Sequence, residues 1–136
     1  MRCSGIVGFL VAGMIALAGQ AAADGDAAKG ENLFKGFLQC SSCHSLEAGE
    51  TKVGPTLAGL FGRKAGSAEG YKRYSEAMAN SKVIWDEETL NEFLKNPRKL
   101  IPENKMEFSP GGMVPRVSSA QHRADLIAYL KEATAQ

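Results

Sequence analysis

The sequence has no surplus of either charge. Its 136 residues include 16 lysines and arginines against 15 aspartates and glutamates, a formal charge of +1. This balance excludes a broad basic face of the kind that holds nucleic acids. Cysteine is also scarce, and the odd count of three excludes a framework in which every cysteine forms an intramolecular disulfide. At this length we expect a single domain.

The alternation of polar and apolar residues that marks a β-strand is also absent from residues 40–70. Helix signals are present instead, and they predict an all-α domain of four to five short helices joined by long glycine-rich loops. Asp26 and Asp86 stand where helices need a capping residue, and Ser118 with Gln121 matches a capping box. Such loops enclose only a small core, so we expect a bound group in the middle. The expected helices span residues 27–35, 75–81, 86–97 and 118–133.

Residues 1–23 have the features of a secretory signal peptide. Arg2 supplies the positive charge, residues 6–18 are apolar, and residues 21–23 are three alanines that suit a cleavage site. The apolar stretch is shorter than the roughly 20 residues of a membrane span, although an uncleaved N-terminal anchor is the alternative. Cleavage removes Cys3 and leaves a domain of residues 24–136 without stable membrane insertion. We expect export to an oxidising compartment, a bacterial periplasm.

The two remaining cysteines belong to the segment Cys40-Ser41-Ser42-Cys43-His44. This is the C-x-x-C-H pattern of covalent c-type haem attachment. Each thiol adds across one vinyl group of the haem, and the histidine that follows binds the iron. Cys40 and Cys43 are therefore expected to form thioethers, and His44 to be an axial ligand of one haem c.

Other interpretations of this segment fit less well. A thioredoxin-like dithiol needs a strand before it and a βαβ context. A zinc site needs further ligands, and His122 is the only other histidine. A simple disulfide leaves His44 and the empty core without a role. On the opposite side of the iron, four residues qualify as ligands, and spacing alone does not separate the loop methionines from each other: Met78, Met106, Met113 and His122.

Together these motifs resemble class I cytochrome c, of the mitochondrial and bacterial cytochrome c2 type. The resemblance extends over nearly all of residues 25–134, although the stretch between Phe34 and Cys40 is longer by two residues. It implies the class I cytochrome c fold wrapped around one haem. The similar segments are residues 25–30 with Phe34, 40–44, 53–57, 59–64, Trp85 with 87–90, 96–97, 101–102, 105–106 with Phe108, and 123–134.

The resemblance also implies roles for individual residues. Met106 becomes the distal iron ligand, and Met113 becomes loop packing. The carbonyl of Pro55 would accept a hydrogen bond from His44, and Gly30 would let the first helix approach the last. Four more residues are placed near the haem propionates, three as donors and the last where the family has a hydroxyl: Arg63, Tyr74, Trp85 and Asn104.

A histidine and a methionine together leave the iron no open position, which favours one-electron transfer over catalysis. The resemblance therefore implies a soluble periplasmic carrier and not an enzyme, working between a cytochrome bc complex or dehydrogenase and a terminal oxidase or photosynthetic reaction centre. We expect a monomer that docks transiently on redox proteins near Arg98, Lys99 and Lys105, and that binds no nucleic acid. A haem-based ligand sensor or weak peroxidase and a thiol–disulfide oxidoreductase are the alternatives.

Overall fold

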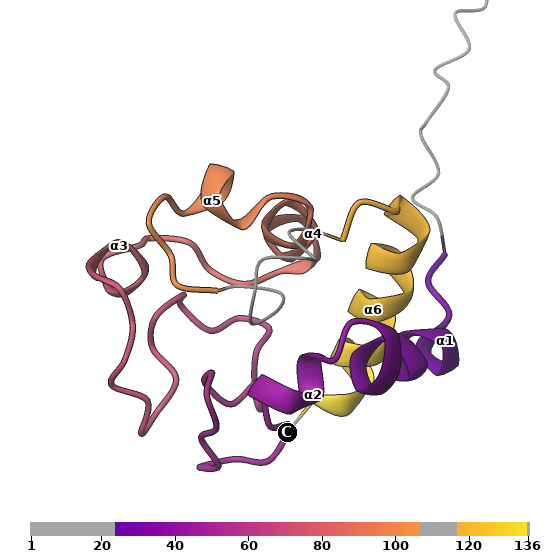
Figure 1. The fold of residues 1–136 in the computed structure, drawn as a ribbon, viewed down its shortest axis with the longest axis horizontal. Helices are drawn as coiled ribbons and strands as arrows, with labels where there is room; N and C mark the ends of the chain where they lie inside the picture. Colours follow the sequence, from indigo (N-terminus) through magenta and orange to yellow (C-terminus); the bar gives the residue numbers. More distant parts are fainter. Residues whose placement is uncertain (1–23, 107–116, 136) are drawn as a thin grey trace, which may run out of the picture.

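The structure is a computed structural model and describes residues 24–106 and 117–135 (Figure 1). These ranges contain no strand, only an isolated bridge between Lys64 and Ile84, so the expected all-α fold is confirmed. There are more helical segments than expected because three of them are single turns of four residues. The segments are α1 Ala27–Asn32, the π-helix η1 Leu33–Phe37, α2 Cys40–Cys43, α3 Glu76–Ala79, α4 Glu87–Lys95, α5 Pro97–Leu100 and α6 Ala120–Ala133. None of the helices in these two ranges is long and apolar enough to cross a membrane.

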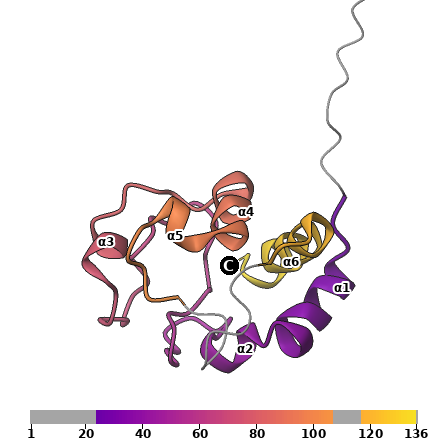
Figure 2. The same ribbon diagram turned by 45° about the horizontal axis from the view of Figure 1, so that its top comes forward.

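The first and last helices pack against each other on one side of the molecule (Figures 1 and 2). The contact is so close that a Cβ on Gly30 would lie 2.0 Å from the carbonyl oxygen of Asp125. Beside it, the rings of Phe34 and Tyr129 lie 5.6 Å apart. The carboxylate of Asp125 also accepts a hydrogen bond of 2.8 Å from the backbone N–H of Asp26. The expected role of Gly30 in close helix packing is therefore confirmed.

The predicted N-terminal caps of two helices are confirmed. The Asp26 carboxylate accepts a hydrogen bond from the Lys29 N–H at the start of α1. The Asp86 carboxylate accepts one from the Thr89 N–H, and the Thr89 hydroxyl oxygen accepts the Asp86 N–H in return. These hydrogen bonds hold the pKa of both aspartates below the usual value, so the charged caps act at neutral pH and are lost in acid.

The start of α6 differs from the prediction by one residue. Ser119, and not Ser118, accepts the hydrogen bond from the His122 N–H that caps the helix. Gln121 is not part of a capping box, since its side chain donates to the Asp125 carboxylate and the Asp24 carbonyl instead. Gln121 thus contacts its own helix and the segment before α1, and the predicted capping box does not form.

The first helix also ends differently from the prediction. The α-helical hydrogen bonds end at Asn32, and the chain continues as η1, with the Leu38 N–H donating to the Leu33 carbonyl at 2.9 Å. A π-turn accommodates an extra residue without ending the helix. It buries Phe34 and Leu38 while Phe37 is left 73% exposed.

Helices α3, α4 and α5 lie on the other side of the molecule from α1 (Figures 1 and 2). Leu90, Phe93 and Leu94 form the buried face of α4, and Leu126, Ile127 and Leu130 are the buried apolar residues of α6. These side chains and Phe34 belong to one apolar core. That core surrounds a pocket between the two sides, which contains the candidate site.

We expect Gly30→Ala to destabilise the protein by about 2 kcal/mol, because the added methyl group overpacks the contact between α1 and α6. The change would otherwise favour the helix by about 1 kcal/mol. Gly36→Ala is the matched control, because nothing lies within 4 Å of its added Cβ. Denaturant unfolding of both variants checks this, and equal stability of the two would contradict it.

Candidate functional site

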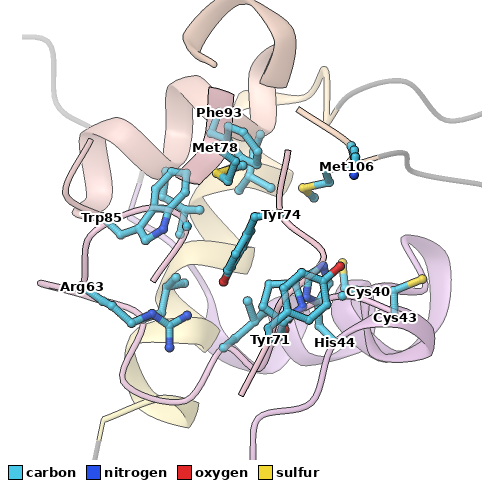
Figure 3. Close-up of a pocket in the computed structure, with 18 of the residues that line it drawn as sticks. Cys40, Cys43, His44, Arg63, Tyr71, Tyr74, Met78, Trp85, Phe93 and Met106 are labelled. Atoms are coloured by element: carbon cyan, nitrogen blue, oxygen red, sulfur yellow. The ribbon is translucent and has the colours of Figure 1, made fainter. Parts of the chain in front are cut away.

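The pocket has mainly apolar walls (Figure 3). Segments far apart in the sequence, from Phe34 to Leu130, contribute to it, so the pocket exists only in the folded protein. Its apolar lining includes Phe34, Leu57, Leu60, Met78, Leu90, Phe93, Leu94, Leu126 and Leu130.

Helix α2 places both cysteines on the pocket wall. Cys40 and Cys43 are free thiols, partly buried, and separated by one helical turn. Gln39 precedes them with a left-handed φ of 52°, which turns the chain from η1 into α2. Burial raises the pKa of the Cys40 thiol to about 11, and the neighbouring Cys43 adds to this effect. Both cysteines line the same pocket.

His44 follows α2 and is held in one orientation. Its Nδ1 lies 2.8 Å from the Pro55 carbonyl oxygen, so Nδ1 carries the proton and donates it. Gly54 lies against the ring, and a Cβ at this position would lie 2.5 Å from the ring carbon Cε1. Burial lowers the pKa of His44, partly offset by the Pro55 hydrogen bond. The imidazole is thus neutral, with Nε2 available as a metal ligand.

One end of the pocket is polar. Arg63 donates to the Thr56 carbonyl at 2.9 Å and to the Ala58 carbonyl at 2.6 Å. Its Nε is buried and has no hydrogen-bond partner within the described part of the chain. The Tyr74 hydroxyl accepts the Ala68 N–H at 3.1 Å and lies at the same end as Arg63 and Trp85 (Figure 3). Burial lowers the pKa of Arg63, while Tyr74 raises it, and an anion near Nε would offset the burial.

The four candidates for the second iron ligand lie in different places. Met106 and Met78 both line the pocket, and Met106 lies across it from His44 in the view of Figure 3. Met78 is only 9% exposed and also packs in the apolar core. His122 is exposed on α6, with its ring 6.2 Å from that of Phe37, and it does not line the pocket. Met113 lies outside the described residues.

Asn104 does not line the pocket, in contrast to Arg63, Tyr74 and Trp85. Its amide nitrogen donates to the Ile101 carbonyl at 2.7 Å, and its amide oxygen accepts the Met106 N–H at 3.0 Å. The side chain therefore engages the backbone of its own loop.

Tyr71 and Arg73 were not assigned to the site from the sequence, although both line the pocket. Tyr71 donates to the Val53 carbonyl at 2.9 Å, and Arg73 donates to the Lys52 carbonyl while lying 5.4 Å above the Tyr71 ring. Together they join two loops at the pocket. No periodic pattern in this loop indicates such a contact, which depends on segments about 20 residues apart.

The chain matches the family model described as cytochrome c over residues 27–134. A cytochrome c of Gibberella zeae is 49% identical over 113 residues, which cover 82% of this chain and 98% of that protein. A cytochrome c of Sesamum indicum is 49% identical over 82% of this chain and 93% of its own length. A cytochrome c of Chlamydomonas reinhardtii is 48% identical over 82% of this chain and 92% of its own length. The chain therefore belongs to the cytochrome c family.

Two consequences follow from this membership. The protein is an electron carrier and binds one covalently attached haem c. The expected periplasmic location is wrong, because these relatives come from a fungus, a plant and an alga, which have no periplasm. They point to the mitochondrial intermembrane space instead. The predicted signal peptide, residues 1–23, lies outside the described residues.

The pocket fits this cofactor. A haem is an apolar disc with two carboxylates on one edge, and the pocket has apolar walls with its cationic end at Arg63. The buried Nε of Arg63 without a partner is the group that a propionate would satisfy. Across residues 24–106 and 117–135, no three His, Cys, Asp or Glu side chains gather as a metal site, and nothing there supports a zinc centre.

Proposed function

We propose that Cys40 and Cys43 form the two haem thioethers and that His44 and Met106 are the axial ligands of the iron. The observation that supports this most is the placement of all four residues on one apolar pocket. The cysteines and His44 come from α2 and the residue after it, whereas Met106 comes from the loop after α5. Segments about 60 residues apart in the sequence thus meet at one site.

The described side chains prepare the pocket for its cofactor. Pro55 and Gly54 fix the imidazole of His44 so that Nε2 points away from the Pro55 carbonyl. Met106 contributes a neutral thioether, which favours the reduced iron. At the polar end, Arg63 and Tyr74 offer donors to the propionates, and Trp85 lies beside them. Asn104 positions the Met106 backbone.

Bound haem c supplies one-electron chemistry, because its iron changes oxidation state with little change in geometry. The protein contributes burial and a fixed ligand on each side, which leaves no open position for a substrate. We therefore place this chain among carriers and not enzymes. Its donor would be a cytochrome bc complex or a dehydrogenase, and its acceptor a terminal oxidase.

Partners would dock where α5 leads to Met106. Arg98 and Lys99 are exposed on α5, and Lys105 is exposed beside the pocket. With 16 basic and 15 acidic residues in the chain, any positive docking surface is local. A small charged surface of this kind suits the weak, brief contacts of electron-transfer proteins.

Residues 1–23 would be removed, leaving a monomeric domain of residues 24–136. The intact mass of the purified protein checks this boundary and the attachment of the haem together. A mass that includes residues 1–23, or that loses the haem on denaturation, would contradict the proposal.

Met106→Ala is expected to abolish the absorption band of a thioether bound to ferric iron, because the ligand is lost. The reduced variant should then bind carbon monoxide readily, whereas the reduced native protein should not bind it. Visible spectra of the oxidised and reduced proteins measure both effects.

Met78→Leu is the matched control, since it replaces a second pocket methionine with a side chain of similar volume. It should keep the band, as should Met113→Ala. A band that survives Met106→Ala reassigns the ligand. Carbon monoxide binding to the native reduced protein would instead favour a ligand sensor or peroxidase.

Electron transfer to a purified oxidase is expected to slow by at least about tenfold as salt rises to about 0.2 M, because screening weakens the docking charges. Lys99→Gln should reduce the rate at low salt and flatten this dependence. Lys131→Gln on α6, which removes the same charge beside Glu87, is the control and should do neither. An electron-transfer rate that does not change with ionic strength would contradict the proposed docking surface.

A further inference from the structure

A tight turn connects α5 to Met106. The Asn104 N–H donates to the Ile101 carbonyl at 3.4 Å and closes the turn, with Pro102 and Glu103 as its central residues. Glu103 has a left-handed φ of 58°. A turn with positive φ at its third position follows the type II pattern, which favours proline second and glycine or asparagine third. Pro102 is therefore the favoured residue at the second position of the turn, whereas Glu103 is an unfavourable residue at the third.

Asn104 holds this turn closed. Its amide bonds to both the Ile101 carbonyl, at 2.7 Å, and the Met106 N–H, at 3.0 Å. Ile101 and Asn104 are 3% and 5% exposed, so both ends of the turn are anchored in the protein. The position of the Met106 backbone therefore depends directly on the geometry of the turn.

Only two non-glycine residues in the described ranges have a positive φ, and Glu103 is one of them. Gln39 is the other non-glycine residue there with positive φ, at 52°, and it directly precedes Cys40. Non-glycine residues in this conformation are strained and persist where their surroundings impose it. Glu103 itself is exposed, so its strain comes from the backbone of the turn and not from a crowded side chain.

We propose that Glu103 and Asn104 are positioning residues that set how easily Met106 leaves the iron. Strain at Glu103 is released when the turn moves away, so it favours displacement of Met106. The two hydrogen bonds of Asn104 oppose that movement. This inference rests on the proposed function, in which Met106 is the distal ligand.

Titration of the oxidised holoprotein with imidazole tests the proposal. One neutral ligand replaces another: a bond from an imidazole nitrogen to iron forms, the bond from the Met106 sulfur breaks, and no electron is transferred. Loss of the thioether absorption band reports the exchange.

Glu103→Gly should raise the dissociation constant for imidazole about fivefold, equivalent to about 1 kcal/mol, because glycine adopts positive φ without strain. Asn104→Ala should lower the constant about fivefold, because the turn loses both side-chain hydrogen bonds. Gln39→Gly is the matched control: it relieves the same strain beside Cys40 and should leave the constant within about twofold of the native value.

The pairing of the two glycine variants separates a local effect from general stabilisation. Denaturant unfolding is expected to show both variants as more stable, whereas only Glu103→Gly changes the imidazole titration. Equal shifts in both variants, or no shift in Glu103→Gly, would overturn the proposal. A native protein without the thioether band, or a band that survives Met106→Ala, would overturn the ligand assignment and this inference with it.

Discussion

The structure depends on the filling of an apolar pocket at its centre. Most of its core side chains also line this pocket, so they pack around a space and not only against one another. An apolar space of this kind costs stability unless something occupies it. The covalent haem c of the cytochrome c family supplies the missing core. Phe34 of η1 and the buried face of α6 line one side of the pocket, and α4 lines another. The close contact of α1 with α6, made through Gly30, supports α6 from behind.

The distribution of polarity around the pocket determines how the cofactor would be oriented. The fixed imidazole of His44 and the thiols of α2 lie on one wall, and the buried Nε of Arg63 lies at the polar end. Met106 reaches the pocket from a loop whose geometry depends on Asn104. In the proposed assignment, the Pro55 carbonyl and Gly54 would hold the proximal ligand His44, whereas the turn at Glu103 would hold the distal ligand Met106. We therefore propose that the distal side is the easier one to open.

Signals that act over a few residues were predictable from the sequence. Asp26 and Asp86 cap their helices as expected, because a cap needs only the next turn. The start of α6 was predicted one residue too early, because the adjacent Ser118 and Ser119 are both suitable caps. The role of Asn104 was missed, because residue type alone does not show that its amide bonds the backbone of its own loop. The π-turn before Cys40 escaped prediction for a related reason, since no residue pattern distinguishes it from an α-helix. The predicted location rested on the sequence pattern of residues 1–23 alone, and the fungal, plant and algal relatives contradict it.

Hydrogen exchange of a haem-free chain tests the central claim most directly. The double variant Cys40→Ala with Cys43→Ala lacks both thiols that we propose attach the haem, and it keeps every other core residue. The account predicts that amides of α1, α4 and α6 lose most of their protection, because the pocket cannot remain folded around an empty apolar space. Protection equal to that of the haem-bound protein would show that side chains alone form the core, and would contradict the account.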